Sequence, residues 1–482
     1  MDRWLGEVLL PRLRPLMYEE GGPVIMVQLE NEYGCLTGLC DHRYTAHLRN
    51  LTRDKLGPRA VLFTTDNPIF SHLMEGKIPG VYATVDFGVD KDASEMFRIQ
   101  RVFEPRGPLD NSEYHTGWMD HWGAPHQTLD SQALAKGLDA ILALNASVNL
   151  FMFHGGTSFG LTAGSNGGAK FQSNPTSYDY NAPVSEAGDP TDKYIAIRDV
   201  ISKYLPVPRG PIPGPTRKGV YGQVNMTAAA SLWEVTGWLP TTHNPWPLTF
   251  EHLDLSGGLV IYSSTVPCRM PDPARLSLPG VHDRGYVFVS GEEVGVVSRE
   301  EGLSDVAVRV AEGDALTVVV ESQGRISAGP HINDFKGLTS NVTLNGHLLK
   351  GWNMTAVPLT YPSMLPRPPG PRQPPVPPGT PRGGLTFYTG VFNVPAEDPH
   401  PLNTFLKLDG WTKGVAWVNK FCLGRYWPAM GPQVTLFVPW SVLKRGQNNL
   451  LLLELEAAPC PAPCPCSATL QDKHILDGPT PP

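Results

Sequence analysis

Two glutamates, each at the end of a predicted strand, are the strongest candidates for chemistry in this sequence. The apolar segment 24–29 runs into Glu30, Asn31 and Glu32, and a second predicted strand ends in Glu113. In a parallel α/β barrel, the active site is assembled at the carboxyl ends of the strands. Two carboxyl groups placed there could cleave a glycosidic bond, one as the acid for the leaving oxygen and one at the anomeric carbon.

The elements that would position these glutamates alternate between strand and helix. Predicted strands cover residues 24–30, 60–65, 80–87, 108–113 and 147–153, and predicted helices cover 44–56, 94–103 and 132–144. This alternation is typical of βα units with a parallel sheet. Before it, residues 1–18 carry apolar side chains at helical spacing, which predicts an amphipathic helix.

The second half of the chain has a different pattern. After a proline-rich segment at 206–215, short strands separated by turns are predicted at 258–264, 285–290, 307–310, 315–321, 415–418, 434–438 and 450–455. Between the two groups of strands, ten of the twenty residues from 362 to 381 are proline. Such a segment forms an extended, semi-rigid linker.

The composition excludes several classes of protein. The chain has 482 residues, of which 41% are hydrophobic and 18% are charged, so extensive disorder is excluded. A net charge of −7 provides no basic face for nucleic acid, and no apolar run reaches the ~18 residues of a membrane span. The 49 glycines and 49 prolines favour many loops over a helical bundle.

Cysteines and glycosylation sequons favour a secretory origin. The motif that contains Cys460, Cys464 and Cys466 could form a disulfide loop or hold zinc, and the lack of a second ligand motif favours the disulfide. Residues 1–18 lack the basic start, unbroken apolar stretch and cleavage site of a signal peptide. The sequons are Asn50, Asn145, Asn225, Asn341 and Asn353.

Residues Gly21–Tyr33 resemble, at every position, the signature of glycoside hydrolase family 35, the β-galactosidases. The similarity extends to about Ala458 outside the proline-rich segment, and it points to the animal β-galactosidase-like proteins of this family. The other similar motifs are Asn111–Glu113, Thr116–Trp118, Asp120–Gly123, Gly155–Thr157, Pro175–Tyr180, Ser185–Gly188, Gly410–Gly414 and Leu423–Pro428.

The resemblance implies a role for four residues. Glu113 matches the nucleophile and Glu32 the acid/base, while Asn31 and Tyr180 match residues that contact the sugar. A retaining mechanism requires carboxyl groups about 5–5.5 Å apart. Strict alternation along a strand would place Asn31 and Glu32 on opposite faces, so both reach one site only if the strand end bends.

The fold implied by the resemblance is a truncated (β/α)8 TIM barrel with about five of its eight βα units, followed by two all-β, jelly-roll-like domains. Only 31 residues precede Glu32, which indicates an N-terminally truncated isoform or fragment. The expected divisions are a barrel at 1–215, a first β domain at 216–361, a linker at 362–384, a second, galactose-binding-like β domain at 385–472 and a tail at 473–482.

Two functions follow from these expectations. One is a retaining exo-glycosidase that releases terminal β-D-galactosyl residues, with no metal or other cofactor, in the lysosomal lumen or outside the cell. The other is a catalytically inactive truncated isoform that binds carbohydrate or protein through its β domains. Both allow a homo-oligomer. Hydrogen-bonded histidines are expected rather than metal ligands at His115, His121 and His126.

Overall fold

A computed structural model describes residues 1–36, 40–168, 170–329, 331–359, 384–395, 400–460 and 466–481. The chain divides into two compact units. Unit 1 comprises residues 1–118, 127–155 and 180–215, and unit 2 comprises 119–126, 156–179 and 216–482. Apart from Gly384, the expected linker at 362–384 lies outside the described residues.

Unit 1 is built on a sheet whose described strands are all parallel. In spatial order they are β1 (Val27–Gln28), β2 (Leu62–Asp66), β3 (Tyr82–Val85), β4 (Asp110–His115) and β5 (Ser147–Phe151). The sequence predicted each of these strands, but β1 is much shorter than the expected 24–30. Val24 bridges to Met17 before it, and a positive φ of 58° at Glu30 ends the extended backbone after it.

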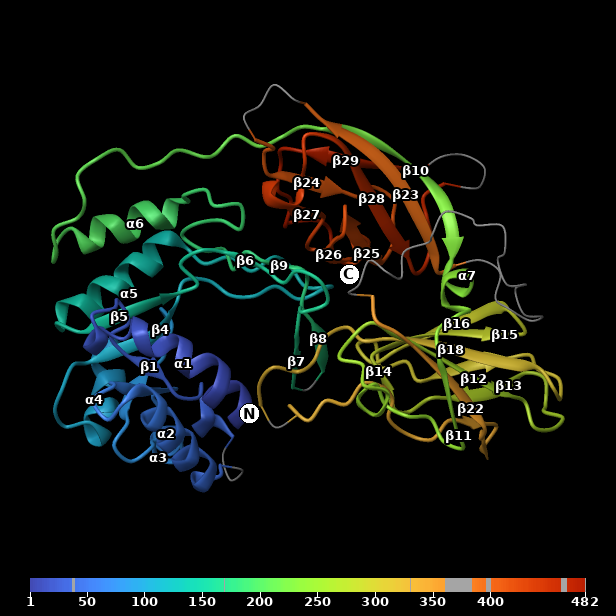
Figure 1. The fold of residues 1–482 in the computed structure, drawn as a ribbon, viewed down its shortest axis with the longest axis horizontal. Helices are drawn as coiled ribbons and strands as arrows, with labels where there is room; N and C mark the ends of the chain where they lie inside the picture. Colours follow the sequence, from blue (N-terminus) through green and yellow to red (C-terminus); the bar gives the residue numbers. More distant parts are fainter. Residues whose placement is uncertain are drawn as a thin grey trace. The chain divides into compact units, whose positions relative to one another are not determined.

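Helices connect the strands of this sheet. They are α2 (His42–Leu56), α3 (Phe70–Gly76), α4 (Ala93–Phe103), α5 (Ser131–Ala143) and α6 (Asp192–Ile201). Aspartates at 41, 92 and 130 begin α2, α4 and α5 by accepting hydrogen bonds from main-chain N–H groups of the first turn. The predicted helices agree with these three to within two residues, whereas α3 and α6 were not predicted. Figure 1 shows α5 beside α6, with which it packs.

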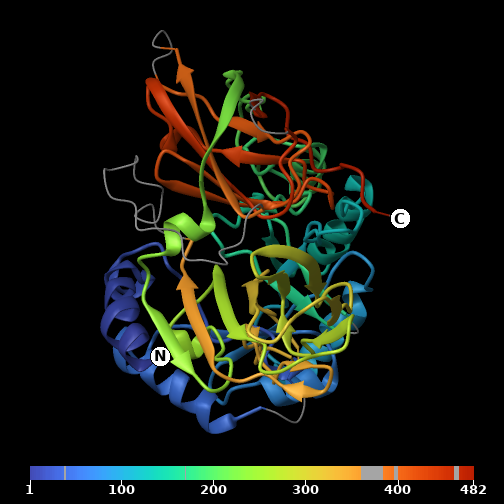
Figure 2. The same ribbon diagram turned by 90° about the vertical axis from the view of Figure 1, so that its right-hand side faces the viewer.

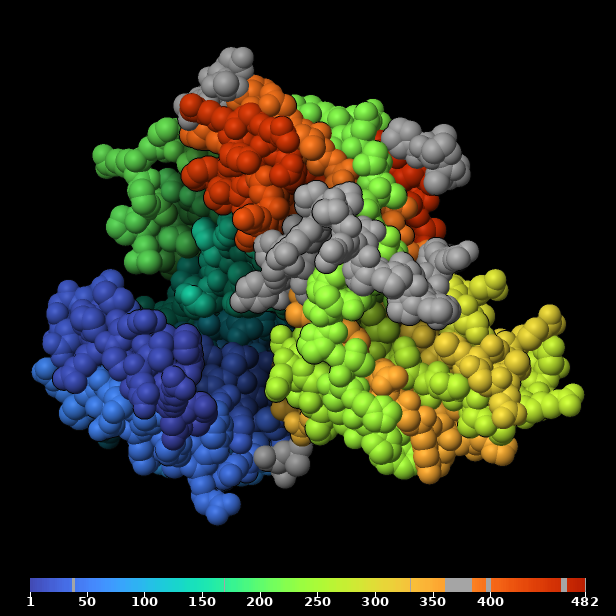
Figure 3. Space-filling model, turned by 45° about the vertical axis from the view of Figure 1, so that its right-hand side comes forward, coloured from blue at the N-terminus to red at the C-terminus, as the bar shows by residue number. Residues whose placement is uncertain are grey.

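The N-terminal segment is helical, as expected, but it is not one regular helix. It consists of a π-helix at Arg3–Leu9, α1 (Leu10–Leu13) and a 3-10 turn at Arg14–Leu16. Pro11 and Pro15 cannot donate the main-chain hydrogen bonds that a continuous α-helix needs. In Figure 3 this segment, in dark blue, lies at the surface, and its Trp4 is 59% exposed.

The first β region of unit 2 contains a sheet that is buried on both faces. Alternate residues of β12 pack into different cores: Val260 and Tyr262 belong to one apolar cluster, and Leu259 and Ile261 to another. The sheet is antiparallel, in the order β11 (Thr241–Asn244), β22 (Trp352–Val357), β12 (Leu259–Thr265), β18 (Ala315–Glu321), β15 (Arg284–Val289) and β16 (Glu292–Ser298).

A smaller sheet and several two-stranded ribbons complete this region. The smaller sheet contains β17 (Asp305–Val308), β13 (Ala274–Ser277), β20 (Thr343–Leu344) and β21 (His347–Leu348). The ribbons are β6 (Gly156–Thr157) with β9 (Ser177–Tyr178), β7 (Ser165–Gly167) with β8 (Phe171–Ser173), and β14 (Val281–His282) with β19 (Gly337–Leu338). The sequence predicted β17, as a strand at 307–310, but none of the other short elements.

The C-terminal sheet contains a strand from much earlier in the chain. β10 (Gly222–Ser231) pairs with β23 (Thr386–Val394) and β29 (Cys466–Gln471). Its Val224 and Met226 are fully buried in the same apolar cluster as Leu450 and Leu452. Figure 2 shows β10, in green, against the orange and red strands. The expected boundaries assigned residues 222–231 to the first β domain, and this pairing corrects them. Those boundaries were expected at proline-rich segments, and such segments carry no information about which distant strands pair with each other.

The order of this antiparallel sheet places β10 near its middle. The strands are β26 (Phe421–Tyr426), β25 (Gly414–Val418), β28 (Gly446–Glu454), β23 (Thr386–Val394), β10, β29 (Cys466–Gln471), β24 (Thr404–Lys407) and β27 (Thr435–Val438). A short helix, α7 (Leu232–Thr236), follows β10 directly.

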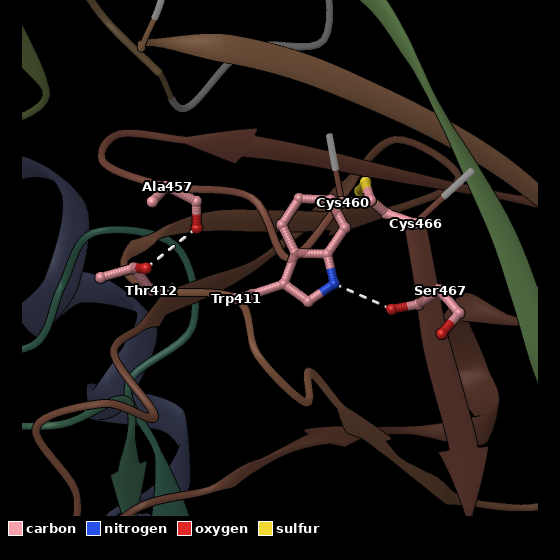
Figure 4. Close-up of a disulfide and its surroundings, with 6 residues drawn as sticks. All are labelled: Trp411, Thr412, Ala457, Cys460, Cys466 and Ser467. Carbon is pink, nitrogen blue, oxygen red and sulfur yellow. Dashed lines mark hydrogen bonds between the residues drawn. A yellow bond between two sulfur atoms is a disulfide. The ribbon is translucent and has the colours of Figure 1, made fainter. Parts of the chain in front are cut away.

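Cys460 and Cys466 form a disulfide at the start of β29. Figure 4 shows it beside Trp411, whose indole N–H donates a hydrogen bond to the main-chain oxygen of Ser467 at 2.8 Å. The disulfide interpretation of this motif is therefore confirmed for these two cysteines. Cys464, the third cysteine of the motif, lies outside the described residues.

Candidate active site

The backbone bends where β1 ends. Glu30 and Glu32 both have left-handed conformations, with φ of 58° and 48°. The main-chain N–H of Glu32 donates a hydrogen bond to the oxygen of Thr65 on β2 at 2.9 Å, which fixes the bend against the sheet. Strict alternation therefore does not apply beyond residue 29, and the bend that the sequence required is present.

This bend gives Glu30 and Asn31 different partners. The carboxylate of Glu30 accepts a hydrogen bond from the hydroxyl of Tyr44 on α2. The side-chain oxygen of Asn31 accepts one from the amide of Gln28 at 2.9 Å, and Asn31 is exposed. Glu30 is thus bound to a helix, whereas Asn31 remains accessible to a ligand.

The carboxyl group of Glu32 lies in a network formed by the ends of the next two strands. Asn67, which follows β2, donates hydrogen bonds from its side-chain nitrogen to Glu32 at 2.5 Å and to Asp86 at 2.6 Å. Asp86 follows β3 and is 1% exposed. One amide nitrogen therefore connects the accessible carboxyl group of Glu32 with a buried one.

Two buried aspartates lie near Glu32. Burial, followed by the negative charges of Glu32 and then Glu113, raises the pKa of Asp86 well above its usual value. Asp66, also 1% exposed, accepts a hydrogen bond from the N–H of Gly34 at 2.8 Å. Burial raises the pKa of Asp66 to about 7. Both aspartates therefore favour the neutral form at acidic pH.

Glu113 lies on β4, and two neighbouring residues orient it. Its main-chain N–H donates a hydrogen bond to the side chain of Asn111 at 3.2 Å, and its carboxylate lies 3.3 Å from Nε2 of His115. The side chains of Glu113 and His115 are each 19% exposed. The negative charge of Glu113 is one of the causes that raise the pKa of Asp86, after burial and Glu32.

Tyr180 belongs to an aromatic cluster next to Glu113. Its ring centroid lies 6.1 Å from Trp118 and 5.6 Å from Phe151, and Trp118 in turn lies 5.1 Å from His115. Tyr180 is only 3% exposed, and its backbone has a φ of 64°. Gly117 is required at its position, because a Cβ there would lie 1.7 Å from the main-chain oxygen of Tyr180.

A cavity of about 340 Å³ opens beside this cluster. His115 and Trp118 form part of its wall, so it adjoins the carboxylate of Glu113 through His115. Asp90 and Gln127 add polar groups to the wall. Aromatic and polar side chains around a concave surface are typical of sites for small ligands.

Comparison with known proteins shows the family of the chain. The sequence profile described as "Glycosyl hydrolases family 35" matches residues 1–204. Human β-galactosidase is 44% identical over 472 residues, which cover 94% of this chain and 68% of the relative. β-Galactosidase of Canis lupus familiaris is 43% identical, covering 100% of this chain and 74% of the relative. This chain belongs to glycosyl hydrolase family 35.

Further matches agree with the order of domains in this family 35 chain. The mouse "Beta-galactosidase-1-like protein" is 41% identical over 94% of the chain and 70% of its own length. A profile described as the first all-β domain of β-galactosidase matches residues 247–359, and one described as its galactose-binding domain matches 385–448. The family 35 domain is thus followed by all-β domains, as the sequence predicted.

All four residues expected to form the site of this family 35 protein lie in unit 1 and within the matched range: Asn31, Glu32, Glu113 and Tyr180. Sequence reasoning missed Asn67, Asp66 and Asp86. The signal was available, because Asp66 and Asp86 end apolar strands in the same way as Glu32 and Glu113.

The three histidines considered as metal ligands have other partners in the family 35 chain. His115 contacts Glu113, His121 contacts Asn166 and His126 contacts Asp120. In the part of the chain that the structure describes, no three His, Cys, Asp or Glu side chains are grouped to hold a metal ion. Among the same residues, no helix combines the length and apolar character needed to span a bilayer.

Proposed function

We propose that this protein hydrolyses terminal β-D-galactosyl residues of galactosides with retention of configuration, with Glu113 as the nucleophile and Glu32 as the acid/base. The observation that supports the proposal is that Glu32 follows β1 and Glu113 lies on β4 of one parallel sheet, toward the carboxyl ends of both strands. Two carboxyl groups at the same edge of one sheet are the minimum that a retaining glycosidase needs.

The reaction proceeds in two steps. Glu113 attacks the anomeric carbon and forms a galactosyl ester while Glu32 donates its proton to the departing oxygen. Glu32, now a carboxylate, then takes a proton from water, whose oxygen attacks the same carbon and releases Glu113. His115, at 3.3 Å, holds the attacking carboxylate in place before the first step.

Two further residues contact the sugar in this proposal. Asn31 is exposed beside Glu32, and the left-handed backbone at Tyr180 directs this residue toward the aromatic cluster next to Glu113.

The parallel sheet of unit 1 corresponds to five βα units of a TIM barrel, and the β regions of unit 2 correspond to jelly-roll-like domains. We propose a location in the lysosomal lumen or outside the cell, which the relationship to family 35 supports.

Covalent trapping tests the proposal. A 2-deoxy-2-fluorogalactoside with a good leaving group slows hydrolysis of the ester, so mass spectrometry of peptides is expected to find the label on Glu113. Glu113→Gln is expected to abolish both labelling and hydrolysis of a chromogenic β-galactoside. Glu30→Gln, which changes the neighbouring glutamate bound to Tyr44, is the matched control and keeps both. Label on another residue, or hydrolysis by Glu113→Gln, contradicts the assignment.

A second candidate function is carbohydrate binding without catalysis. The match of residues 385–448 to a galactose-binding domain favours it. Calorimetric titration of the wild-type protein with galactose measures this binding, and the labelling and hydrolysis experiments on the same protein separate the two functions. Binding by a wild-type protein that shows neither labelling nor hydrolysis would support the non-catalytic function.

A further inference from the structure

The Asp86 side chain is buried and is linked to Glu32 through the amide nitrogen of Asn67. Its Oδ2 accepts the hydrogen bond from Asn67, while Oδ1 has no hydrogen-bond partner among the described residues. An ionised Asp86 would keep a buried oxygen without a hydrogen-bond donor, which is unfavourable. A protonated Asp86 can instead donate a hydrogen bond to a neighbouring acceptor. The nearest acceptor in this network is Glu32, which shares the Asn67 donor with Asp86.

We propose that Asp86 is a positioning residue for the acid/base: with Asn67 it holds the Glu32 carboxyl group, and it shares one proton with that group. This inference rests on the proposed role of Glu32. Asp86 acts through Glu32 and does not touch the substrate.

The groups that face Asp86 come from three neighbouring elements. Glu32 approaches from the end of β1, Asn67 from the end of β2 and Glu113 from β4. Two of the three are acidic, so ionisation of Asp86 would add a third negative charge to the same buried region. Acidic groups that interact this closely lose their protons as a unit, and the last proton is held to a higher pH than by a single carboxyl group.

Charge and proton accounting shows how such a pair could serve the reaction. With Glu113 ionised and one proton on the Glu32–Asp86 pair, the three carboxyl groups carry two negative charges. Esterification neutralises Glu113 while Glu32 gives the one proton of the pair to the leaving oxygen, which leaves both Glu32 and Asp86 as carboxylates. The total remains two negative charges. Hydrolysis returns a proton from water to the pair and frees the Glu113 carboxylate.

The pH dependence of activity provides the first test. Asp86→Asn removes the second carboxyl group and its charge repulsion with Glu32, while the new side-chain amide can donate a hydrogen bond to Glu32. The basic limb of the kcat/KM profile is expected to move to lower pH by about one unit or more. A purely structural role would lower activity without moving the limb. Asp110→Asn, which changes a partly buried aspartate at the start of β4, is the control and keeps the wild-type limb.

Infrared titration of the full chain tests the shared proton without turnover. The band of protonated carboxyl groups is expected to contain a component that is absent in Asp86→Asn. In Glu32→Gln and in Glu113→Gln, this component is expected to disappear at lower pH than in the wild type, because one repelling charge has been removed. These two variants change accessible side chains, so they report on Asp86 even if Asp86→Asn does not fold.

The outcomes separate the two proposals. A component that does not respond to Glu32→Gln, or an Asp86 that is ionised at acidic pH, overturns the shared proton whatever the activity. A coupled titration in a protein without galactosidase activity leaves the pair established and overturns the proposed function instead. In an active enzyme, an unmoved basic limb in Asp86→Asn overturns the positioning role.

Discussion

The ammonium group of Lys193 donates hydrogen bonds to both oxygens of Asn181, at 2.6 Å to the main chain and 2.5 Å to the side chain. A third hydrogen bond reaches the main-chain oxygen of Thr116 at 2.7 Å. Lys193 is 2% exposed, and Asn181 directly follows Tyr180. Lys193 therefore ties the segment that presents Tyr180 to the end of β4.

Replacing this lysine is expected to affect both stability and substrate binding. Lys193→Met leaves three buried oxygens without this donor, at a cost of about 2–4 kcal/mol in unfolding free energy. The Michaelis constant is expected to rise because Tyr180 is no longer held. Urea unfolding and steady-state kinetics measure the two effects. Lys203→Met, which changes a lysine with a 57% exposed side chain, is expected to cost less than about 0.5 kcal/mol.

The proposed role of Glu32 predicts a dependence on the leaving group. Glu32→Gln is expected to slow hydrolysis of an alkyl galactoside by about 10²–10⁴-fold, because the leaving oxygen is no longer protonated. Dinitrophenolate leaves its galactoside without the help of an acid, so the first step with this substrate is expected to be nearly unaffected by Glu32→Gln. Stopped-flow detection of the released phenol measures that step. Equal losses for both substrates would exclude Glu32 as the acid.

His115 is expected to support the nucleophile. His115→Phe removes the hydrogen bond to Glu113, and formation of the galactosyl ester is expected to slow by about tenfold or more. His115→Tyr, which restores a hydroxyl donor, is expected to recover most of the rate. His47→Phe changes an exposed histidine that pairs with Asp2 and is the control. If His115→Phe forms the ester at the wild-type rate, the contact has no role in catalysis.

The raised pKa of Asp66 predicts that the unfolding free energy of the protein depends on pH. The pKa of Asp66 is raised to about 7, so the folded protein keeps a proton that the unfolded chain loses near pH 4. This group therefore makes stability fall as pH rises from about 4 to 7. Asp66→Asn is expected to reduce the loss of unfolding free energy between pH 5 and pH 8, by about 3 kcal/mol at most. Asp54→Asn, with a 69% exposed side chain, is expected to retain the wild-type slope.

The disulfide is expected to contribute measurably to the stability of unit 2. Changing Cys460 and Cys466 together to serine removes a crosslink across six residues of sequence separation, at a cost of about 2 kcal/mol. Urea unfolding followed by tryptophan fluorescence is suitable, because Trp411 packs beside the bridge. Cys268→Ser, at an exposed free cysteine, is the control. Equal midpoints for the two variants would contradict the prediction.

Periodic apolar patterns predicted the parallel sheet of unit 1 because each strand lies between turn or helix signals. The same patterns could not predict the length of β1. A left-handed backbone at Glu30 and Glu32 ends that strand, and glutamate carries no local preference for this conformation. Tertiary contacts, such as that of Glu32 with Thr65, hold the bend.

The residues of the candidate site could likewise be predicted only in part. Glu32 and Glu113 could be proposed from strand-end position and motif. Asn67 and Asp86 acquire their relation to Glu32 only when the ends of β2 and β3 come together, because they are separated from it by 35 and 54 residues of sequence. The role of Lys193 is likewise absent from the sequence, since it lies on α6 and acts on a main-chain oxygen of β4's end.

The position of β10 has a consequence for how the chain matures during synthesis. A ribosome releases residues 222–231 long before it makes β23, and the other neighbour, β29, comes last among the described strands. β10 must therefore wait, with its apolar side chains uncovered, for most of the remaining translation. A fragment that starts at residue 384 would also lack the strand that joins β23 to β29, which would leave two separate half-sheets. Production of the C-terminal sheet as a separate protein therefore requires β10 as well, either fused or as a separate peptide.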